Sequence, residues 1–208
     1  MKSLIKSSLF TVTALTASLP AQAHHMMDGQ TPETFMQGML SGLAHPVIGI
    51  DHFAFVLMVG LLAVALSGMS KYLMPAAFVG ATIAGTGLHL AAADLPAAEL
   101  IIAFSVLSAG ALVLLRKQLP VLLLGIGVAG FGLFHGYAYG ESIVGAETGV
   151  LAAYLIGFSL IQYALVIGIT LGMEKIAARS ERVQLLATRG AAALATVTGA
   201  VFLAMNMA

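Results

Sequence analysis

Five ionisable side chains interrupt stretches of this sequence that are otherwise apolar. His45, Asp51 and His52 fall in one apolar stretch, and His89 and His135 fall in two others. The chain contains no cysteine, which excludes thiolate metal sites. Imidazole and carboxylate groups suit Ni²⁺, Co²⁺, Zn²⁺ or Cu²⁺ better than Mg²⁺ or Ca²⁺. The residue types therefore indicate a site for a transition-metal cation.

The most closely spaced group lies in the segment 45–52, which reads HPVIGIDH. On an unbroken helix, His45 and His52 would share a face but lie ~10 Å apart. That is too far for one metal ion with ligand bonds of ~2.0–2.1 Å. Pro46 and Gly49 can break the helix and shorten the gap. Asp51 is then either a direct ligand or an acceptor that orients an imidazole. The alternative is a kinked helix whose polar groups only bond to neighbouring helices.

The overall composition shows what surrounds these side chains. Of the 208 residues, 60% are hydrophobic and 9% are charged, with nine Lys and Arg balanced by nine Asp and Glu. A soluble domain has about 25% charged residues. The balance disfavours a soluble enzyme, a disordered chain and a nucleic-acid binder. The chain is therefore predicted to lie in a lipid bilayer.

The first 23 residues have the features of a secretory signal peptide. Lys2 and Lys6 precede a short apolar run over 9–19, and the segment 21–23 reads AQA, a small-residue cleavage site. A retained first helix is the alternative, but about eleven apolar residues are too few to span a bilayer. Cleavage would place His24 and His25 at the exported N-terminus, where they either capture a divalent cation or have no role.

The rest of the chain contains six apolar stretches, each close to the ~20 residues that cross a bilayer. We predict an all-α fold, a polytopic bundle of six transmembrane helices that forms one metal-transport domain over residues 24–208. The spans are expected near 40–66, 74–93, 97–115, 119–139, 149–173 and 190–207. The longest break between spans is expected over residues 174–189.

The basic residues set the orientation of this bundle. With six spans and an exported N-terminus, all basic residues of the mature chain fall in the three inner loops, at Lys71, Arg116, Lys117, Lys175, Arg179, Arg182 and Arg189. Because Lys and Arg favour the cytoplasmic side, both mature termini are predicted on the non-cytoplasmic side. The ionisable residues inside the spans then gather in the outer half of the bundle, with Glu141 closing the fourth span.

Two motifs resemble those of a known family. The first span contains His45-Pro46-x-x-Gly49-x-Asp51-His52, and the fourth contains Phe134-His135-Gly136-x-Ala138-x-Gly140. Together with the signal peptide and the six spans, they resemble the HupE/UreJ family of nickel/cobalt permeases over essentially the whole mature chain. The resemblance implies transport of Ni²⁺ or Co²⁺, with these histidines and acidic residues as functional positions.

The sequence departs from that family at two positions. The family pattern has an acidic residue where this chain has Ser142, and here the acid is one place earlier, at Glu141. Many members also have a histidine in the fifth span, where this chain has Gln162. Gln162 is either a polar substitute for that histidine or a bridge between helices.

The function predicted from the sequence is uptake of Ni²⁺ or Co²⁺ by a permease of the bacterial inner membrane, not an enzyme. The predicted partners are the cation and the bilayer, without nucleic acid or an organic cofactor, and a homo-oligomer is left open. Alternatives are a haem-binding membrane cytochrome, a metal-dependent intramembrane hydrolase and a metal sensor that does not transport. The residues expected to contact the metal are His45, Asp51, His52, His135, His89, Glu141, His24 and His25.

Overall fold

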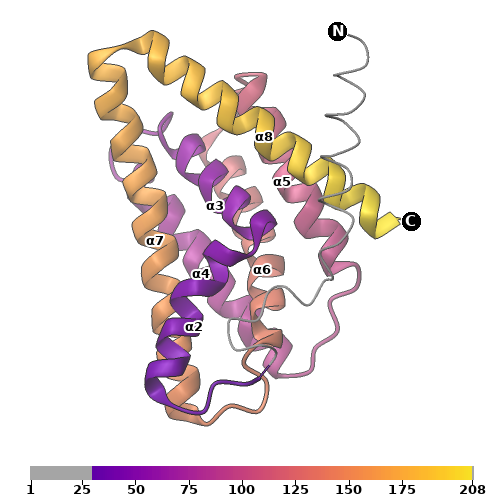
Figure 1. Ribbon diagram of the computed structural model, residues 1–208. Coiled ribbons are helices and arrows are strands. Elements are labelled where there is room, and N and C mark those ends of the chain that lie inside the picture. The colour runs from indigo at the N-terminus through magenta and orange to yellow at the C-terminus, as the bar shows by residue number, and fades with distance from the viewer. Residues whose placement is uncertain (1–29, 208) are drawn as a thin grey trace, which may run out of the picture.

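The structure, a computed structural model, describes residues 30–207, which form helices and no strands. The predicted all-α fold is therefore confirmed (Figure 1). The predicted signal peptide and the pair His24 and His25 lie outside the described residues. The helices are α2 (Phe35–Ile48), α3 (Ile50–Ala63), α4 (Ser70–Leu90), α5 (Ala98–Leu114), α6 (Val121–Glu141), α7 (Thr148–Arg179) and α8 (Glu181–Met207).

The first apolar stretch is broken into two helices, as its Pro and Gly residues predicted. α2 starts at a capping box, in which Thr34 and Gln37 bond each other's backbone N–H groups, and it carries Pro46 in its last turn. Gly49 separates α2 from α3 in an extended conformation, and the two helices are bent by 77° at this point. The carbonyl of Gly49 accepts the first bond of α3, from the N–H of Phe53 at 2.8 Å.

α3 lies at the centre of three helix pairs. α2 packs along α7, α4 along α6, and α5 along α8, while α3 contacts α5, α7 and α8 (Figure 1). Small residues let the paired backbones approach closely. A Cβ atom added at Gly42 would meet the carbonyl of Tyr154, and one added at Gly136 would meet the carbonyl of Thr82. These pairs surround most of α3, whose first turn still exposes Ile50 and Phe53.

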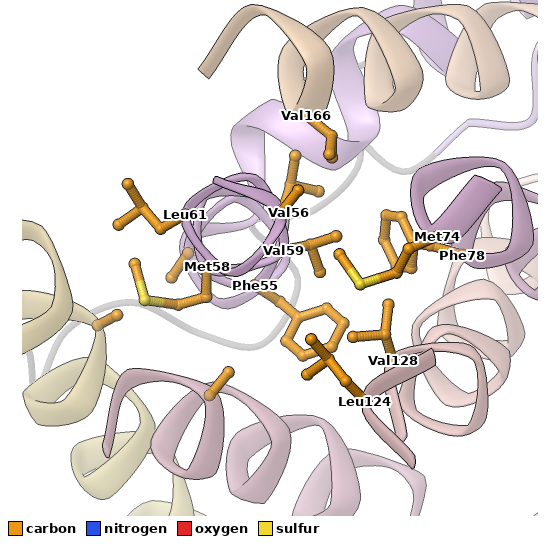
Figure 2. Close-up of a cluster of buried hydrophobic side chains, with 14 of the residues drawn as sticks. Phe55, Val56, Met58, Val59, Leu61, Met74, Phe78, Leu124, Val128 and Val166 are labelled. Atoms are coloured by element: carbon orange, nitrogen blue, oxygen red, sulfur yellow. The ribbon is translucent and has the colours of Figure 1, made fainter. Parts of the chain in front are cut away.

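The side chains of α3 fill an apolar core. Figure 2 looks along α3 and shows its side chains meeting those of α4, α6 and α7. Phe55, Val56, Met58 and Val59 are each at most 1% exposed. We call this group the apolar core cluster; it includes Phe55, Val56, Met58, Val59, Met74, Phe78, Leu124, Val128 and Val166.

The length of the helices bears on the predicted spans. Four helices, α4, α6, α7 and α8, are long and apolar enough to cross a membrane, and the bent pair α2–α3 would make a fifth. α5 has 17 residues, slightly fewer than the ~20 of a typical span. A helical membrane bundle is therefore supported, whereas the count of six spans and their bounds remain predictions.

The break between spans expected over residues 174–189 contains no long loop. α7 continues to Arg179 and α8 begins at Glu181, so that only Ser180 separates them. The charged residues here favour helix as well as water, and polarity alone does not end a helix. Ser180 is extended, and its hydroxyl accepts from the N–H of Val183 at 3.3 Å, which caps the start of α8.

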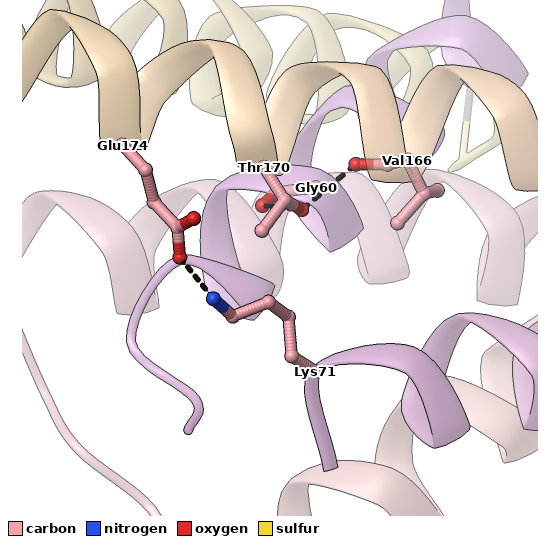
Figure 3. A network of polar contacts seen from close by, with 5 residues as sticks. All are labelled: Gly60, Lys71, Val166, Thr170 and Glu174. Atoms are coloured by element: carbon pink, nitrogen blue, oxygen red, sulfur yellow. Dashed lines mark hydrogen bonds and ion pairs between the residues drawn. The ribbon is translucent and has the colours of Figure 1, made fainter. Parts of the chain in front are cut away.

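Three polar contacts show which ends of the helices lie together. Lys71, at the start of α4, forms an ion pair with Glu174 near the end of α7 (Figure 3). On the same stretch of α7, the hydroxyl of Thr170 donates to the carbonyl of Gly60 at 3.0 Å, which fastens α7 to α3. At the opposite end of the bundle, Thr31 donates to the carbonyl of Val144 at 3.4 Å. The end of the bundle with the Lys71–Glu174 pair carries the basic residues that the sequence assigns to the inner side.

Candidate metal site

Three histidines and one aspartate from three helices lie buried around the break between α2 and α3. His45 comes from the end of α2, Asp51 and His52 from the first turn of α3, and His135 from α6. His45 and His52 are 4% exposed, Asp51 is 3% exposed and His135 is fully buried. We call these four residues the histidine cluster.

The shortest contact in the histidine cluster joins two imidazole rings. Nδ1 of His52 lies 2.8 Å from Nδ1 of His135, and Nε2 of His135 lies 2.9 Å from the hydroxyl of Ser105 on α5. The Ser105 hydroxyl donates to the carbonyl of Ile102 at 2.6 Å, so it accepts from His135 Nε2–H. His135 Nδ1 is then an acceptor, and His52 Nδ1–H donates to it. This assignment of protons follows from the hydrogen bonds.

The broken helix brings His45 close to His52. Their ring centroids are 5.8 Å apart, compared with ~10 Å along an unbroken helix. The shortening expected from the break is therefore present. Nδ1 of His45 lies 3.2 Å from the hydroxyl of Ser142 and 3.3 Å from that of Tyr154. The ring of Tyr139 packs edge-on against both imidazoles, with centroids 4.9 Å from His45 and 4.7 Å from His52.

Gly49 is required at the break because of the space it leaves, and not because of its backbone angles. Its φ of −68° is accessible to any residue. A Cβ atom at this position would lie 2.7 Å from Cδ2 of the His52 ring and 3.4 Å from Oδ1 of Asp51. Asp51 Oδ1 accepts from the backbone N–H of His52 at 2.8 Å. The ring of His52 therefore packs directly over the break.

Two residues predicted to contact the metal lie apart from the histidine cluster. His89 is half-buried in the last turn of α4, where its ring centroid lies 4.6 Å from that of Tyr137. Glu141 is exposed at the end of α6. The neighbouring Ser142, where the family pattern has its acidic residue, is instead buried and contacts His45. A metal role for His89 and Glu141 remains a prediction.

Sequence reasoning did not single out the hydroxyl groups that surround the imidazoles. Ser105, Tyr139 and Tyr154 are fully buried, and Ser142 is 6% exposed. A serine or tyrosine in an apolar helix is not a distinctive signal, because its hydroxyl often bonds the backbone of its own helix. Ser105 does so as well, with Ile102. Only the packing of α5 against α6 and of α2 against α7 shows that the hydroxyls of Ser105 and Tyr154 face histidines.

The spacing of the imidazole nitrogens is close to what a cation needs. Within residues 30–207, no three His, Asp or Glu side chains are already arranged to hold one metal ion. Two nitrogens bound to one tetrahedral metal lie about 3.3 Å apart. The 2.8 Å between the Nδ1 atoms of His52 and His135 is somewhat shorter. A small rotation of the two rings would therefore leave room for one ion between the two Nδ1 atoms, a position that we call the seat. His45 and Asp51 belong to the same buried cluster.

The histidine cluster ends at the apolar core cluster. Phe55, one turn after His52 on α3, stacks on His135 with ring centroids 4.5 Å apart and planes inclined by 14°. Phe78 and Phe131 meet the Phe55 ring at centroid distances of 5.7 and 6.0 Å. The histidine cluster thus lies between the apolar core cluster and a second buried hydrophobic group near the α6–α7 connection, which includes Ile143, Val150 and Phe158.

A bundle of long apolar helices that buries several histidines belongs to the class of helical integral membrane proteins. The model of the HupE/UreJ protein family matches residues 12–202. The chain is also 32% identical over 153 residues to Protein HupE of Rhizobium leguminosarum bv. viciae, covering 73% of this chain and 78% of that protein. No solved structure matches the chain.

The chain therefore belongs to the HupE/UreJ family. This membership confirms the resemblance carried by the two histidine motifs. It supports a membrane protein associated with nickel or cobalt transport, in a family of transporters and accessory proteins rather than of enzymes.

Proposed function

We propose that the protein is a permease that takes up Ni²⁺ or Co²⁺ through the histidine cluster. The observation that carries this proposal is the convergence of His45, Asp51, His52 and His135, all less than 5% exposed, at a broken helix. Ionisable side chains are costly inside a bilayer and are typical of ion paths. Broken helices at the middle of a bundle are typical of transport sites.

The proposed path starts on the non-cytoplasmic side. There an open hollow of about 630 Å³ lies between the N-terminal segment and the α6–α7 connection, and Glu33 and Glu147 are among its lining residues. Acidic residues at an entrance raise the local concentration of cations. Ser142 and Tyr154 lead inward to His45, and His45 leads to the pair of His52 and His135.

The contact between His52 and His135 favours a bare cation over a haem as the group bound. A haem held by two histidines needs space for the porphyrin between opposing imidazoles. Here the two Nδ1 atoms are 2.8 Å apart, and the aromatic rings of Phe55 and Tyr139 pack against the same imidazoles. A single ion fits this arrangement with little movement. The ligand types favour nickel and cobalt among other transition metals only together with the family membership.

Uptake into proteoliposomes tests the proposal. Purified protein is reconstituted, and entry of Ni²⁺, Co²⁺, Zn²⁺ and Mn²⁺ is measured at limiting metal, normalised to folded protein in the bilayer. His135→Ala should reduce Ni²⁺ or Co²⁺ flux at least about tenfold, as expected when a residue that holds or orients a metal ligand is lost. Ser108→Ala is the control, because Ser108 is on α5 and bonds only the carbonyl of Ser105 in the described contacts. Equal normalised flux in wild type and His135→Ala would reject the assignment.

A further inference from the structure

Gln162 on α7 is a fully buried amide with one unused oxygen. Its Nε2 donates to the carbonyl of Phe158 at 3.1 Å and to the hydroxyl of Thr82 on α4 at 3.3 Å. Its Oε1 has no hydrogen-bond partner among the residues that the structure describes. A buried acceptor without a donor is unfavourable, which makes this atom worth explaining.

The contacts of Gln162 fix which end of its amide is the oxygen. A backbone carbonyl such as that of Phe158 can only accept, so the amide nitrogen must face it. The hydroxyl proton of Thr82 is directed at the carbonyl of Val79, 2.8 Å away, and Thr82 therefore also accepts from Gln162. Exchanging the nitrogen and the oxygen would lose both bonds. The unused atom is thus an acceptor, which a cation or a water bound to a cation would satisfy.

The position of Gln162 is the boundary between the histidine cluster and the apolar core cluster. One face of α7 carries fully buried residues at four-residue steps, each step rising ~6 Å along the helix. From the outer end inward they are Tyr154, Phe158, Gln162, Val166 and Thr170. Tyr154 contacts His45, whereas Val166 belongs to the apolar core cluster.

Thr82, the partner of Gln162, is also next to the histidine cluster. The backbone of Thr82 packs so closely on Gly136 that a Cβ atom there would meet its carbonyl, and Gly136 follows His135 directly. Thr86, one turn from Thr82, donates to the carbonyl of Gly136 at 2.8 Å. Gln162 is thus linked through Thr82 to the turn of α6 that carries His135.

We propose that Oε1 of Gln162 is a ligand of a second, oxygen-lined station, which receives the divalent cation as it leaves the imidazoles toward the inner side. This inference rests on the proposed function. A cation held by imidazoles and a carboxylate is bound tightly, and conduction requires that it can also leave. A neutral amide oxygen binds such a cation more weakly than an imidazole does, and it can act through the cation's remaining water. Gln162 therefore assists release, whereas the histidine cluster provides capture.

Measuring Ni²⁺ binding and Ni²⁺ flux separately on one variant tests the second station. Gln162→Met has a similar shape and lacks both amide atoms; Thr82 keeps its bond to Val79. Equilibrium Ni²⁺ binding to the purified variant should remain within about twofold of wild type, while Ni²⁺ flux per folded protein should fall at least about tenfold. Thr170→Val is the matched control, because Thr170 is a buried residue of the same α7 face whose hydroxyl is bonded to Gly60 and Val166. Its normalised flux should stay at the wild-type level.

A second variant keeps the test decisive if Gln162→Met does not fold. Gln162→Glu places a carboxylate at the station, and carboxylates suit Mn²⁺ better than imidazoles do. The ratio of Mn²⁺ flux to Ni²⁺ flux should rise in this variant, which a residue that only bridges helices would not change. An unchanged ratio, or wild-type flux in Gln162→Met, overturns the second station while His135→Ala still supports the permease. Absence of flux for every metal in the wild-type protein would instead reject the permease itself.

Discussion

Nδ1 of His52 and Nδ1 of His135 lie 2.8 Å apart, although 83 positions separate the two residues in the chain. Each histidine comes from one of the two motifs of the sequence, so this contact joins the motifs into one site. In the proposed permease, the cation would take the place of the proton assigned between the two rings.

The first prediction concerns the coupling of the two rings. His52→Ala and His135→Ala should each lower Ni²⁺ affinity roughly 10–100-fold. The double variant should be little worse than either single one, because each change already removes the shared seat between the rings. Binding titrations of the purified variants measure this coupling. Losses that simply multiply in the double variant would show that the histidines act independently.

The second prediction concerns the break between α2 and α3. Gly49→Ala should displace the His52 ring, since the new Cβ atom would lie 2.7 Å from Cδ2. We expect a loss of roughly 1–3 kcal/mol in stability and weaker Ni²⁺ binding. Gly80→Ala on α4 is the control, because no atom lies within 4 Å of its Cβ position. If both variants melt and bind Ni²⁺ alike, the ring does not depend on the space at Gly49.

The third prediction concerns orientation, for which the cysteine-free chain is a convenient background. Asp94, Arg116 and Arg182 are exposed and lie in or beside connections between helices. Single cysteines at these positions are treated with a membrane-impermeant maleimide in intact cells. Asp94→Cys should react, whereas Arg116→Cys and Arg182→Cys should react only after permeabilisation. Labelling of Arg116→Cys in intact cells would contradict the inner position of the basic residues.

The fourth prediction concerns His24 and His25, which lie before the described residues. If cleavage leaves them at the exported N-terminus, they act as a tether that captures cations near the entrance. Their joint replacement by alanine should lower uptake at limiting metal by no more than about fivefold, because a tether only raises local concentration. The deficit should disappear at saturating metal. A complete loss of flux would mean that the pair belongs to the path itself.

The sequence predicted the helical fold and the broken first helix because composition, proline and glycine act locally. The same reasoning placed His45 and His52 together once a break at Gly49 was assumed. It could not place Glu141 and Ser142, because which of two neighbouring residues faces inward depends on the rotation of α6. The hydroxyls of Ser105 and Tyr154 were likewise invisible, since their partners come from other helices.

The near-unbroken helical structure over residues 174–189, interrupted only at Ser180, shows a different limit of the sequence. Charged residues there indicate where the chain leaves the apolar layer, but they do not indicate where a helix ends. α7 is about 48 Å long from its 32 residues, which exceeds the ~30 Å of a hydrocarbon core. A helix of this length crosses the layer at a tilt or extends beyond it, and near its end Glu174 forms the ion pair with Lys71.

The break at Gly49 also determines the electrostatics at the histidine cluster. Because α3 begins there, the positive end of its macrodipole, equivalent to about half an elementary charge, is directed at the proposed cation seat. α2 ends at the same break, so the negative end of its own macrodipole opposes that field. Asp51, in the first turn of α3, adds a full negative charge when ionised. At the proposed seat, its carboxylate would make the junction of the two helices attract a cation rather than an anion.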